Sequence, residues 1–142
     1  MTVAYPKPLP DVHDPATEPY WTAASEGRLV CQRCVRCGEL RWTPRWVCPE
    51  CLSFEYTWDD LRPSGRLYSW TTYHRAFDRR FNDDIPYSVA QVELDDGPRM
   101  IGRILGDPTS FVAGDEVEAV FDAVTDSVTL VHWRPITLPS AE

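Results

Sequence analysis

The stretch 31-CQRCVRCGELRWTPRWVCPECLS-53 contains all five cysteines of this 142-residue chain. Cys48 and Cys51 form one C-x-x-C pair. Cys31, Cys34 and Cys37 follow one another at a spacing of three, so the other pair is either Cys31–Cys34 or Cys34–Cys37. Thirteen residues separate the two pairs in the first case and ten in the second. Either arrangement is typical of a zinc ribbon, in which four thiolates bind one zinc ion tetrahedrally.

Gly38 favours the second alternative. A zinc-binding turn bends sharply after its second cysteine, where a residue with positive φ is favoured, and glycine adopts that conformation readily. Gly38 directly follows Cys37, whereas Val35 follows Cys34. The predicted ligands of one zinc ion are Cys34, Cys37, Cys48 and Cys51. Cys31 is then expected to be a small packed thiol.

Four thiolates leave no coordination position for water or substrate, so the predicted zinc site is structural rather than catalytic. The three histidines, His13, His74 and His132, show no metal-binding spacing. The sequence also lacks a G-x-S-x-G nucleophile motif, a dinucleotide-binding fingerprint and a P-loop. We therefore predict no catalytic residue in this chain.

The composition predicts a globular protein in a reducing compartment. Hydrophobic residues make up 43% of the chain and aromatic residues 12%, which is enough for a packed core. No apolar run approaches the roughly 20 residues of a membrane span, and the N-terminus does not resemble a secretory signal. We expect a cytoplasmic protein without membrane contact, whose clustered cysteines bind metal rather than form disulfides.

The charge is unevenly distributed along the chain. A net charge of -8 argues against general nucleic-acid binding, because neutralising phosphates supplies most of that affinity. Residues 28–45 nevertheless contain five arginines and one acid, and the loop 75–84 contains three more arginines. Each segment is either a solvated surface or a contact for an acidic partner or phosphorylated ligand. The candidate contact residues are Arg33, Arg36, Arg41, Arg45, His74, Arg75, Arg79 and Arg80.

The segment before the cysteines predicts an arm followed by a helix. Residues 1–13 contain three prolines and are expected to be extended. Asp14 is a candidate N-cap for a helix over about 15–26, and Gly27 is its stop signal. Pro19 indicates a break or a second start within this helix.

Five strand-like segments follow the cysteines, at 65–75, 86–94, 99–105, 115–121 and 128–136. In the first, Leu67 and Tyr73 are expected on the same face, opposite Trp70. Asp95-Asp96-Gly97 predicts a hairpin turn, and Gly102 is a candidate bulge or bend. Five short strands with turn signals between them favour a closed barrel of the OB-fold type.

The predicted protein is therefore mainly β, with an N-terminal helix, a rubredoxin-like zinc ribbon and a five-stranded OB-fold barrel. We expect an arm and helix over 1–27, the ribbon over 28–60, the OB-fold domain over 61–136 and a tail over 137–142.

Several motifs together resemble one known family. They are EGRL before the first ligand, C-x-x-CG, CPEC, SGRLYSWTTYHR and PYSVAQVELDDG, and the resemblance covers about residues 14–135. They are similar to the acyl-CoA-associated proteins that combine a zinc ribbon with an OB-fold, catalogued as domain of unknown function 35. Cys31 departs from the family, which usually has an aliphatic residue at that position.

The resemblance implies a non-catalytic partner subunit of a thiolase-like enzyme that acts on acyl-CoA. Similar domains occur in hydratase subunits of actinobacterial steroid side-chain degradation, where the partner is a retro-aldolase. The resemblance also implies a hetero-oligomer, expected to be a heterotetramer around a partner dimer. The arginines of 28–45 and 75–84 named as candidate contact residues are then candidate CoA contacts. The alternatives are an accessory subunit of another acyl-CoA thiolase or acyltransferase, a stand-alone acyl-CoA protein, and a nucleic-acid-binding zinc-ribbon/OB-fold protein.

Overall fold

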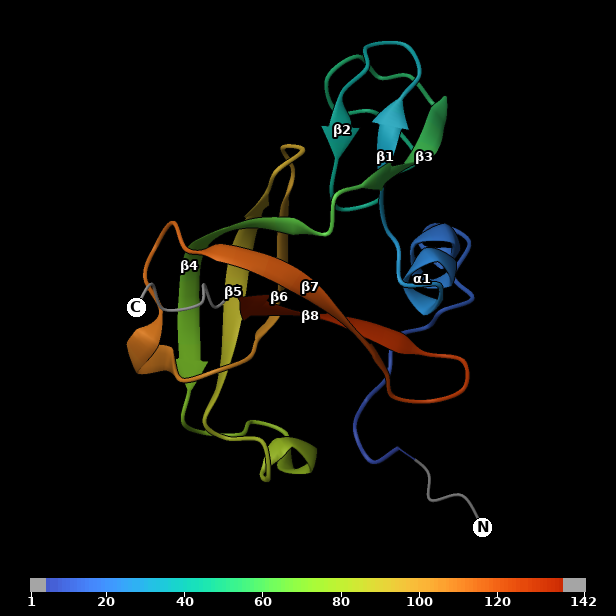
Figure 1. The fold of residues 1–142 in the computed structure, drawn as a ribbon. Coiled ribbons are helices and arrows are strands. Elements are labelled where there is room, and N and C mark those ends of the chain that lie inside the picture. Colours follow the sequence, from blue (N-terminus) through green and yellow to red (C-terminus); the bar gives the residue numbers. More distant parts are fainter. Residues whose placement is uncertain (1–4, 137–142) are drawn as a thin grey trace.

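The structure is a computed structural model that describes residues 5–136. The predicted tail over 137–142 lies outside the described residues. The elements follow the order helix, three-stranded sheet and closed five-stranded barrel (Figure 1). This confirms the predicted fold class. Within residues 5–136, no helix is both long enough and apolar enough to cross a bilayer.

Helix α1 (Glu18–Ser25) begins later than predicted. Asp14 is not its N-cap, because its Oδ1 accepts a hydrogen bond from a backbone N–H two residues on (3.0 Å) and organises a turn before the helix. Thr17 occupies the N-cap position. Pro19 lies in the first turn, where a missing N–H is tolerated, so it starts the helix rather than breaking it. Gly27 (φ +75°) follows the helix end, as predicted.

A three-stranded antiparallel sheet carries the cysteine region. Its strands are β1 (Leu29–Cys34), β2 (Leu40–Arg41) and β3 (Tyr56–Leu61), in the order β2-β1-β3. The long pairing is between β1 and β3, whereas β2 pairs with β1 at two residues. In Figure 1 this sheet lies above the barrel, and the loops that contain the cysteine pairs form its outer end.

The barrel closes in the order β4-β5-β6-β8-β7. Its strands are β4 (Ser64–Tyr73), β5 (Tyr87–Leu94), β6 (Arg99–Ile104), β7 (Glu116–Ala123) and β8 (Thr129–Pro135). The pairing between β6 and β8 is parallel and the others are antiparallel. Two short 3-10 helices, η1 (Arg79–Phe81) and η2 (Pro108–Ser110), lie in the connecting loops. All five predicted strands are present, and the predicted turn at Gly97 joins β5 to β6.

Strand β4 contains an irregularity that the sequence analysis missed. The register between β4 and β5 shifts between Leu67 and Ser69, so the alternation of inward and outward side chains changes there. Leu67 is buried and Trp70 also packs against the core, although the two were expected on opposite faces. Strand β4 pairs with β7 at Ser64–Arg66, before the bulge, and with β5 on both sides of the bulge.

Gly102 does not form a bulge in β6. The register between β5 and β6 is continuous through it. A Cβ atom at Gly102 would lie 3.0 Å from Cδ1 of Trp133, which is a buried side chain of β8. Gly102 therefore leaves room for the indole ring inside the barrel.

The helix, the ribbon sheet and the barrel share one hydrophobic core. Buried side chains from all three parts form a single packed cluster. Its members include Tyr20 and Ala23 of α1, Leu29 and Cys31 of β1, Leu61 of β3, and Leu67, Val92 and Trp133 of the barrel. The ribbon is thus anchored to the barrel by shared packing.

Candidate metal centre and surrounding surfaces

The side chains of Cys34, Cys37, Cys48 and Cys51 converge at the outer end of the ribbon. Their sulfur atoms all lie within 4.8 Å of one another. Cys34 Sγ is 3.5 Å from Cys51 Sγ, and Cys37 Sγ is 3.6 Å from Cys48 Sγ. Sulfurs bound to one tetrahedral zinc ion are expected about 3.8 Å apart, since each Zn–S bond is about 2.3 Å. The four cysteines are therefore positioned to bind one zinc ion.

Two equivalent backbone turns bring the cysteines together. Gly38 (φ +79°) follows Cys37, and its N–H donates to the carbonyl of Cys34 (2.9 Å). Leu52 (φ +64°) follows Cys51 in the second pair, and its N–H donates to the carbonyl of Cys48 (2.9 Å). The positive φ inferred at Gly38 is confirmed. At Leu52 the same conformation is held by a non-glycine residue, which is unusual.

The electrostatics of the four thiols also fit a bound cation. The backbone N–H of Cys37 faces Cys34 Sγ (3.5 Å) and lowers the pKa of that thiol to about 6. The pKa of Cys48 is also lowered, chiefly by the backbone N–H of Cys51. The pKa values of Cys37 and Cys51 are raised even though backbone N–H groups lower them, because burial and neighbouring sulfurs oppose further negative charge. A bound divalent cation offsets this negative charge and so favours the thiolate form of all four cysteines.

Cys31 lies apart from the metal centre. It is fully buried in the shared core, within β1 and opposite Asp59 of β3. Burial raises the pKa of its thiol to about 12, so it remains protonated at neutral pH. Cys31 is therefore the packed thiol that the sequence indicated.

The arginines of the ribbon do not form one patch. Arg33 Nε donates to Asp59 Oδ2 (2.6 Å), and its Nη1 donates to the Gly38 carbonyl (2.8 Å), so its charge is neutralised within the sheet. Arg36 and Arg45 are exposed, and their guanidinium groups make no ion pair with the residues that the structure describes.

Arg41 is the buried arginine of the set, with 7% of its surface exposed. Its Nε donates to Oε1 of Gln32 (2.7 Å), and its Nη2 donates to the carbonyl of Arg45 (3.0 Å). The same Gln32 oxygen accepts a hydrogen bond from the Arg45 backbone N–H (2.8 Å). Gln32 and Arg41 thus hold the loop that follows β2.

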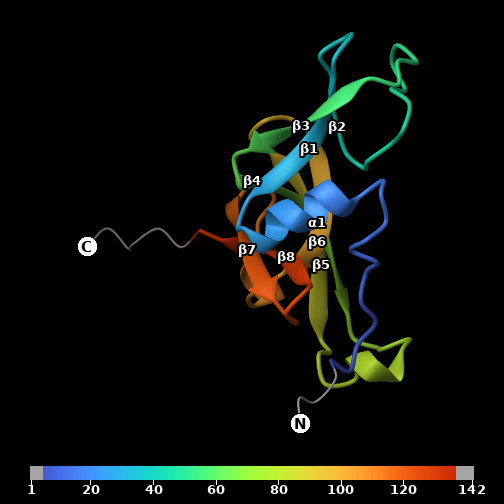
Figure 2. The ribbon, with the colours of Figure 1, turned by 90° about the vertical axis from the view of Figure 1, so that its right-hand side faces the viewer.

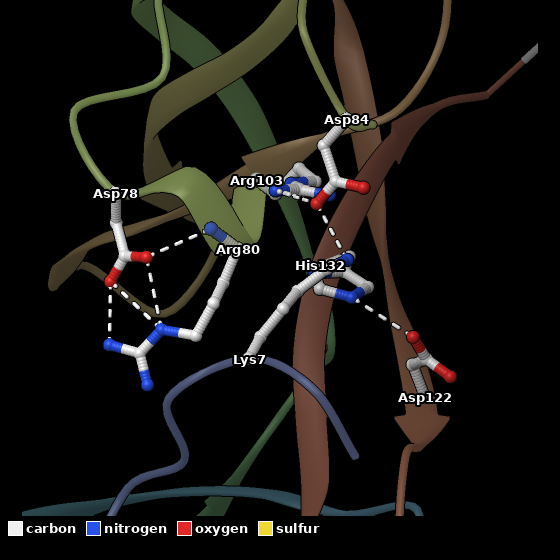
Figure 3. Close-up of polar contacts among 7 residues, drawn as sticks. All are labelled: Lys7, Asp78, Arg80, Asp84, Arg103, Asp122 and His132. Carbon is white, nitrogen blue, oxygen red and sulfur yellow. Dashed lines mark hydrogen bonds and ion pairs between the residues drawn. The ribbon is translucent and has the colours of Figure 1, made fainter. Parts of the chain in front are cut away.

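The loop between β4 and β5 contains the other predicted contact residues. Arg80 pairs with Asp78 (2.6 Å), which also caps the 3-10 helix η1 (Figure 3). The Arg75 guanidinium lies over the ring of Phe77 (5.4 Å), and both side chains are exposed. His74 and Arg79 are also exposed. The structure does not gather these residues with the ribbon arginines.

Sequence reasoning missed an ionic cluster around Asp84. Its Oδ2 is 2.6 Å from Lys7 Nζ of the N-terminal arm and 3.2 Å from Arg103 Nη2 of β6 (Figure 3). Lys7 chiefly lowers the pKa of Asp84, and Arg103 adds to this. Figure 2 shows the arm running from α1 along the barrel to this loop. The one signal in the sequence was that Lys7 is its only lysine.

An apolar groove of about 480 Å³ lies where the helix, the ribbon loop and the barrel meet. Rings of Tyr20 and Trp42, whose centroids are 4.6 Å apart, line one side, and Ile101 of β6 lies exposed on the other. Arg103 and His132 also line it. Since its lining comes from segments distant in sequence, no local motif could have revealed this groove.

A second apolar surface surrounds the metal centre. Four large side chains on the cysteine-bearing loops are more than half exposed. They are Val35, Trp46, Leu52 and Phe54. We call this set the ribbon tip. Exposed apolar surface grouped in this way marks an interaction site more often than isolated apolar residues do.

Comparison with known proteins gives matches over most of the chain. Residues 21–57 match the family model described as the ChsH2 rubredoxin-like zinc ribbon domain, and residues 58–122 match that of the ChsH2 C-terminal OB-fold domain. A DUF35 domain-containing scaffold protein of Methanothermobacter thermautotrophicus is 38% identical over 69% of this chain and 74% of its own length.

Two other relatives have names that refer to acyl-CoA enzymes. The benzoylsuccinyl-CoA thiolase subunit BbsA of Thauera aromatica is 30% identical over 79% of this chain and 80% of its own. A probable enoyl-CoA hydratase alpha subunit of Thermomonospora curvata is 34% identical over 82% of this chain. This chain spans 36% of the length of that relative.

Solved structures show the same architecture. A chain of the Ltp2-ChsH2(DUF35) aldolase superposes with a TM-score of 0.79 and 31% identity, covering 89% of this chain and 98% of that one. A DUF35 protein from Sulfolobus solfataricus superposes with a TM-score of 0.59 at 12% identity, over 86% of each chain, and shows the fold alone. The chain therefore belongs to the DUF35 family, with a ChsH2-type zinc ribbon followed by an OB-fold domain.

Proposed function

We propose that this chain is a non-catalytic subunit that binds and supports a thiolase-like enzyme acting on acyl-CoA. The observation that carries the proposal is the 31% identity, over nearly the whole of both chains, to a chain of the Ltp2-ChsH2(DUF35) aldolase. The name of the Thauera relative, a thiolase subunit, points to the same class of partner.

The chemistry of the chain agrees with a non-catalytic role. Four thiolates on one zinc ion leave no position at which the metal binds substrate or water. The described residues place one histidine in a hydrogen bond with an acid, His132 with Asp122 (3.2 Å), and no serine or cysteine nucleophile extends that pair. Catalytic groups for acyl-CoA cleavage are therefore expected on the partner.

The surface of the chain suits a subunit that is completed by a partner. The ribbon tip and the groove beside α1 both expose apolar side chains. Arg36 and Arg45 lie on the ribbon with the tip, and we assign them to the partner or to the CoA phosphates. We also assign His74, Arg75 and Arg79, in the loop between β4 and β5, to the partner or to the CoA phosphates. Arg33, Arg41 and Arg80 already have intramolecular contacts and are less suited to this task.

We infer further that the partner is a retro-aldolase of steroid side-chain degradation, in a cytoplasmic heterotetramer built around a partner dimer. The aldolase named in the structural match supports this choice. The alternative is an accessory subunit of another acyl-CoA thiolase, which the BbsA relative supports.

The test is co-expression of this chain with thiolase-like proteins of its source genome. The complex is isolated by size-exclusion chromatography, its mass is measured by light scattering, and its zinc content is determined. Cleavage of β-hydroxyacyl-CoA and of β-ketoacyl-CoA thioesters is then assayed for the complex and for each protein alone.

Co-elution, together with an activity that requires both proteins, would support the proposal. Retro-aldol cleavage would identify the aldolase and thiolysis the alternative. Separate elution from every such protein, or full activity of the thiolase-like protein alone, would contradict it. Turnover by this chain alone would show that the chain is itself an enzyme.

A further inference from the structure

Arg41 is a buried cation that has no carboxylate partner among residues 5–136. Its Nε and Nη2 donate to neutral oxygens, of Gln32 and of the Arg45 backbone. Its Nη1 is buried and has no hydrogen-bond partner among the described residues. A buried charge is strongly unfavourable unless an opposite charge lies near it. The charge that offsets Arg41 has to be found elsewhere in the molecule.

The register of the ribbon sheet places Arg41 on the same face as Cys34. Arg41 of β2 lies opposite Gln32 of β1, and Tyr56 of β3 lies opposite Cys34. Directly paired residues of antiparallel strands share a face, and so do residues two apart in one strand, such as Gln32 and Cys34. The Arg41 guanidinium lies over the Tyr56 ring, 5.1 Å from its centroid. It therefore reaches from β2 across β1 to β3, on the face that carries the first zinc ligand.

The second ligand pair lies beside the same arginine. Arg41 and Cys48 line one small cavity of about 190 Å³ at the base of the cysteine-bearing loops. Glu39 and Glu50 also line this cavity. Both glutamates are exposed, and neither forms an ion pair with Arg41 among the described residues. Solvated carboxylates of this kind offset a buried charge poorly, because water screens them.

A zinc ion bound by four thiolates carries two net negative charges, since each thiolate contributes one and the metal carries two positive charges. We propose that Arg41 is a positioning residue of the zinc centre, whose buried guanidinium is the internal counter-charge of the zinc tetrathiolate. Arg41 also holds the loop after β2 through the Arg45 carbonyl. Zinc binding and the order of that loop are therefore linked through one side chain, independently of any partner.

Two substitutions separate charge from hydrogen bonding. Arg41→Met keeps an unbranched apolar stem and removes the charge, whereas Arg41→Lys keeps the charge and loses the planar hydrogen-bonding group. Arg28→Met is the matched control. Arg28 precedes β1, away from the cysteine-bearing loops, and Glu26 and Asp60 already neutralise it.

The affinity for zinc is measured in the full chain by competition with a chromophoric chelator. Loss of an outer-shell partner typically weakens metal binding 10- to 100-fold, and we expect that loss for Arg41→Met. Arg41→Lys should lose less than about tenfold, and Arg28→Met should match the wild type. With Co²⁺ in place of zinc, the thiolate-to-cobalt charge-transfer bands should shift in Arg41→Met and stay close to wild type in Arg41→Lys.

The rate at which neutral iodoacetamide alkylates the ligand thiols gives a second measure, and it should rise in the Met variant alone. Equal losses in the Met and Lys variants would overturn the proposal, because the hydrogen bonds would then be what matters. Unchanged affinity in Arg41→Met would also overturn it. If Arg41→Met does not fold, Arg41→Lys still decides, because a tenfold or larger loss in that variant contradicts a charge role.

Discussion

Replacing Cys37 by alanine should remove the zinc ion, whereas replacing Cys31 by alanine should leave it bound. Cys37 Sγ lies 3.6 Å from Cys48 Sγ within the four-sulfur cluster. Structural zinc in small domains binds with an apparent free energy of about 10–16 kcal/mol. That is as large as the whole stability of a typical domain, about 5–15 kcal/mol. A chain with three thiolates is therefore expected to lose the ordered ribbon.

The effect of Cys31→Ala should be much smaller. The substitution removes one fully buried sulfur atom from the core, comparable to a methylene group, at about 0.8 kcal/mol. A small cavity adds to this loss, for a total of about 1–2 kcal/mol. For a chain of this size, that corresponds to a fall in Tm of roughly 3–8 °C.

Zinc per chain is measured by atomic spectrometry after gel filtration, and stability by thermal and urea unfolding. We expect close to one zinc in the wild type and in Cys31→Ala, and almost none in Cys37→Ala. Zinc retained by Cys37→Ala but lost from Cys31→Ala would refute the reasoning from Gly38. It would show instead that Cys31 and Cys34 form the first ligand pair.

Three further substitutions test other parts of the fold. Gly65→Ala should destabilise the barrel by about 3 kcal/mol, because its Cβ would lie 2.9 Å from a backbone Cα atom of β5, and backbone cannot move aside easily. Asp84→Asn should cost about 1–2 kcal/mol and release the arm at Lys7. Leu52→Gly should stabilise the chain by up to about 1 kcal/mol, because a positive φ suits glycine.

Gly65→Ala has a control variant that is measured in the same unfolding experiments. Gly114→Ala places a Cβ in open space at a positive φ, so it should cost about 1 kcal/mol from strain alone. If Gly65→Ala costs no more than that, close packing at Gly65 is not the reason for its glycine. Hydrogen exchange in the arm should rise in Asp84→Asn, and unchanged protection would contradict the contact with Lys7. A less stable Leu52→Gly variant would mean that packing of the leucine outweighs its backbone strain.

The Asp84 cluster also predicts a pH dependence. The folded-state pKa of Asp84 lies below its ordinary value, chiefly because of the hydrogen bond from Lys7. The stabilisation is therefore fully present above the unfolded-state pKa of about 3.9 and is lost as pH falls through the lower folded-state pKa. The difference in stability between wild type and Asp84→Asn should shrink below about pH 4. A difference that stays constant down to pH 2 would contradict this origin.

The features that the sequence predicted correctly depend on residues close together in the chain. The spacing of Cys34, Cys37, Cys48 and Cys51 indicated the zinc ribbon because each pair closes a short loop. The alternation of Ser88, Ala90, Val92 and Leu94 indicated β5 because successive side chains of a strand point to opposite faces. In both cases the geometry of a short segment is sufficient to predict the structure from the sequence.

The features that it missed depend on contacts between distant segments. The bulge in β4 belongs to its pairing with β5, just after the residues that also pair with β7, and no residue near Tyr68 signals it. Gly102 was interpreted as a bulge or bend because the contact that requires a glycine there, with the Trp133 ring, comes from another strand. Arg33 and Arg41 look alike in sequence, yet they project from opposite faces of the sheet and differ in burial. Strand pairing, which the sequence does not show, decides the role of each.

The shared core has a consequence for how the chain unfolds. The two family matches meet at residues 57 and 58, within β3, yet the packed cluster extends from Leu29 and Leu61 to Trp133 without interruption. The two domains that the family models describe are therefore expected to unfold together. Differential scanning calorimetry should show a single transition, and the ratio of van't Hoff to calorimetric enthalpy should be close to one. Removing zinc at one end should then lower the melting temperature of the barrel at the other.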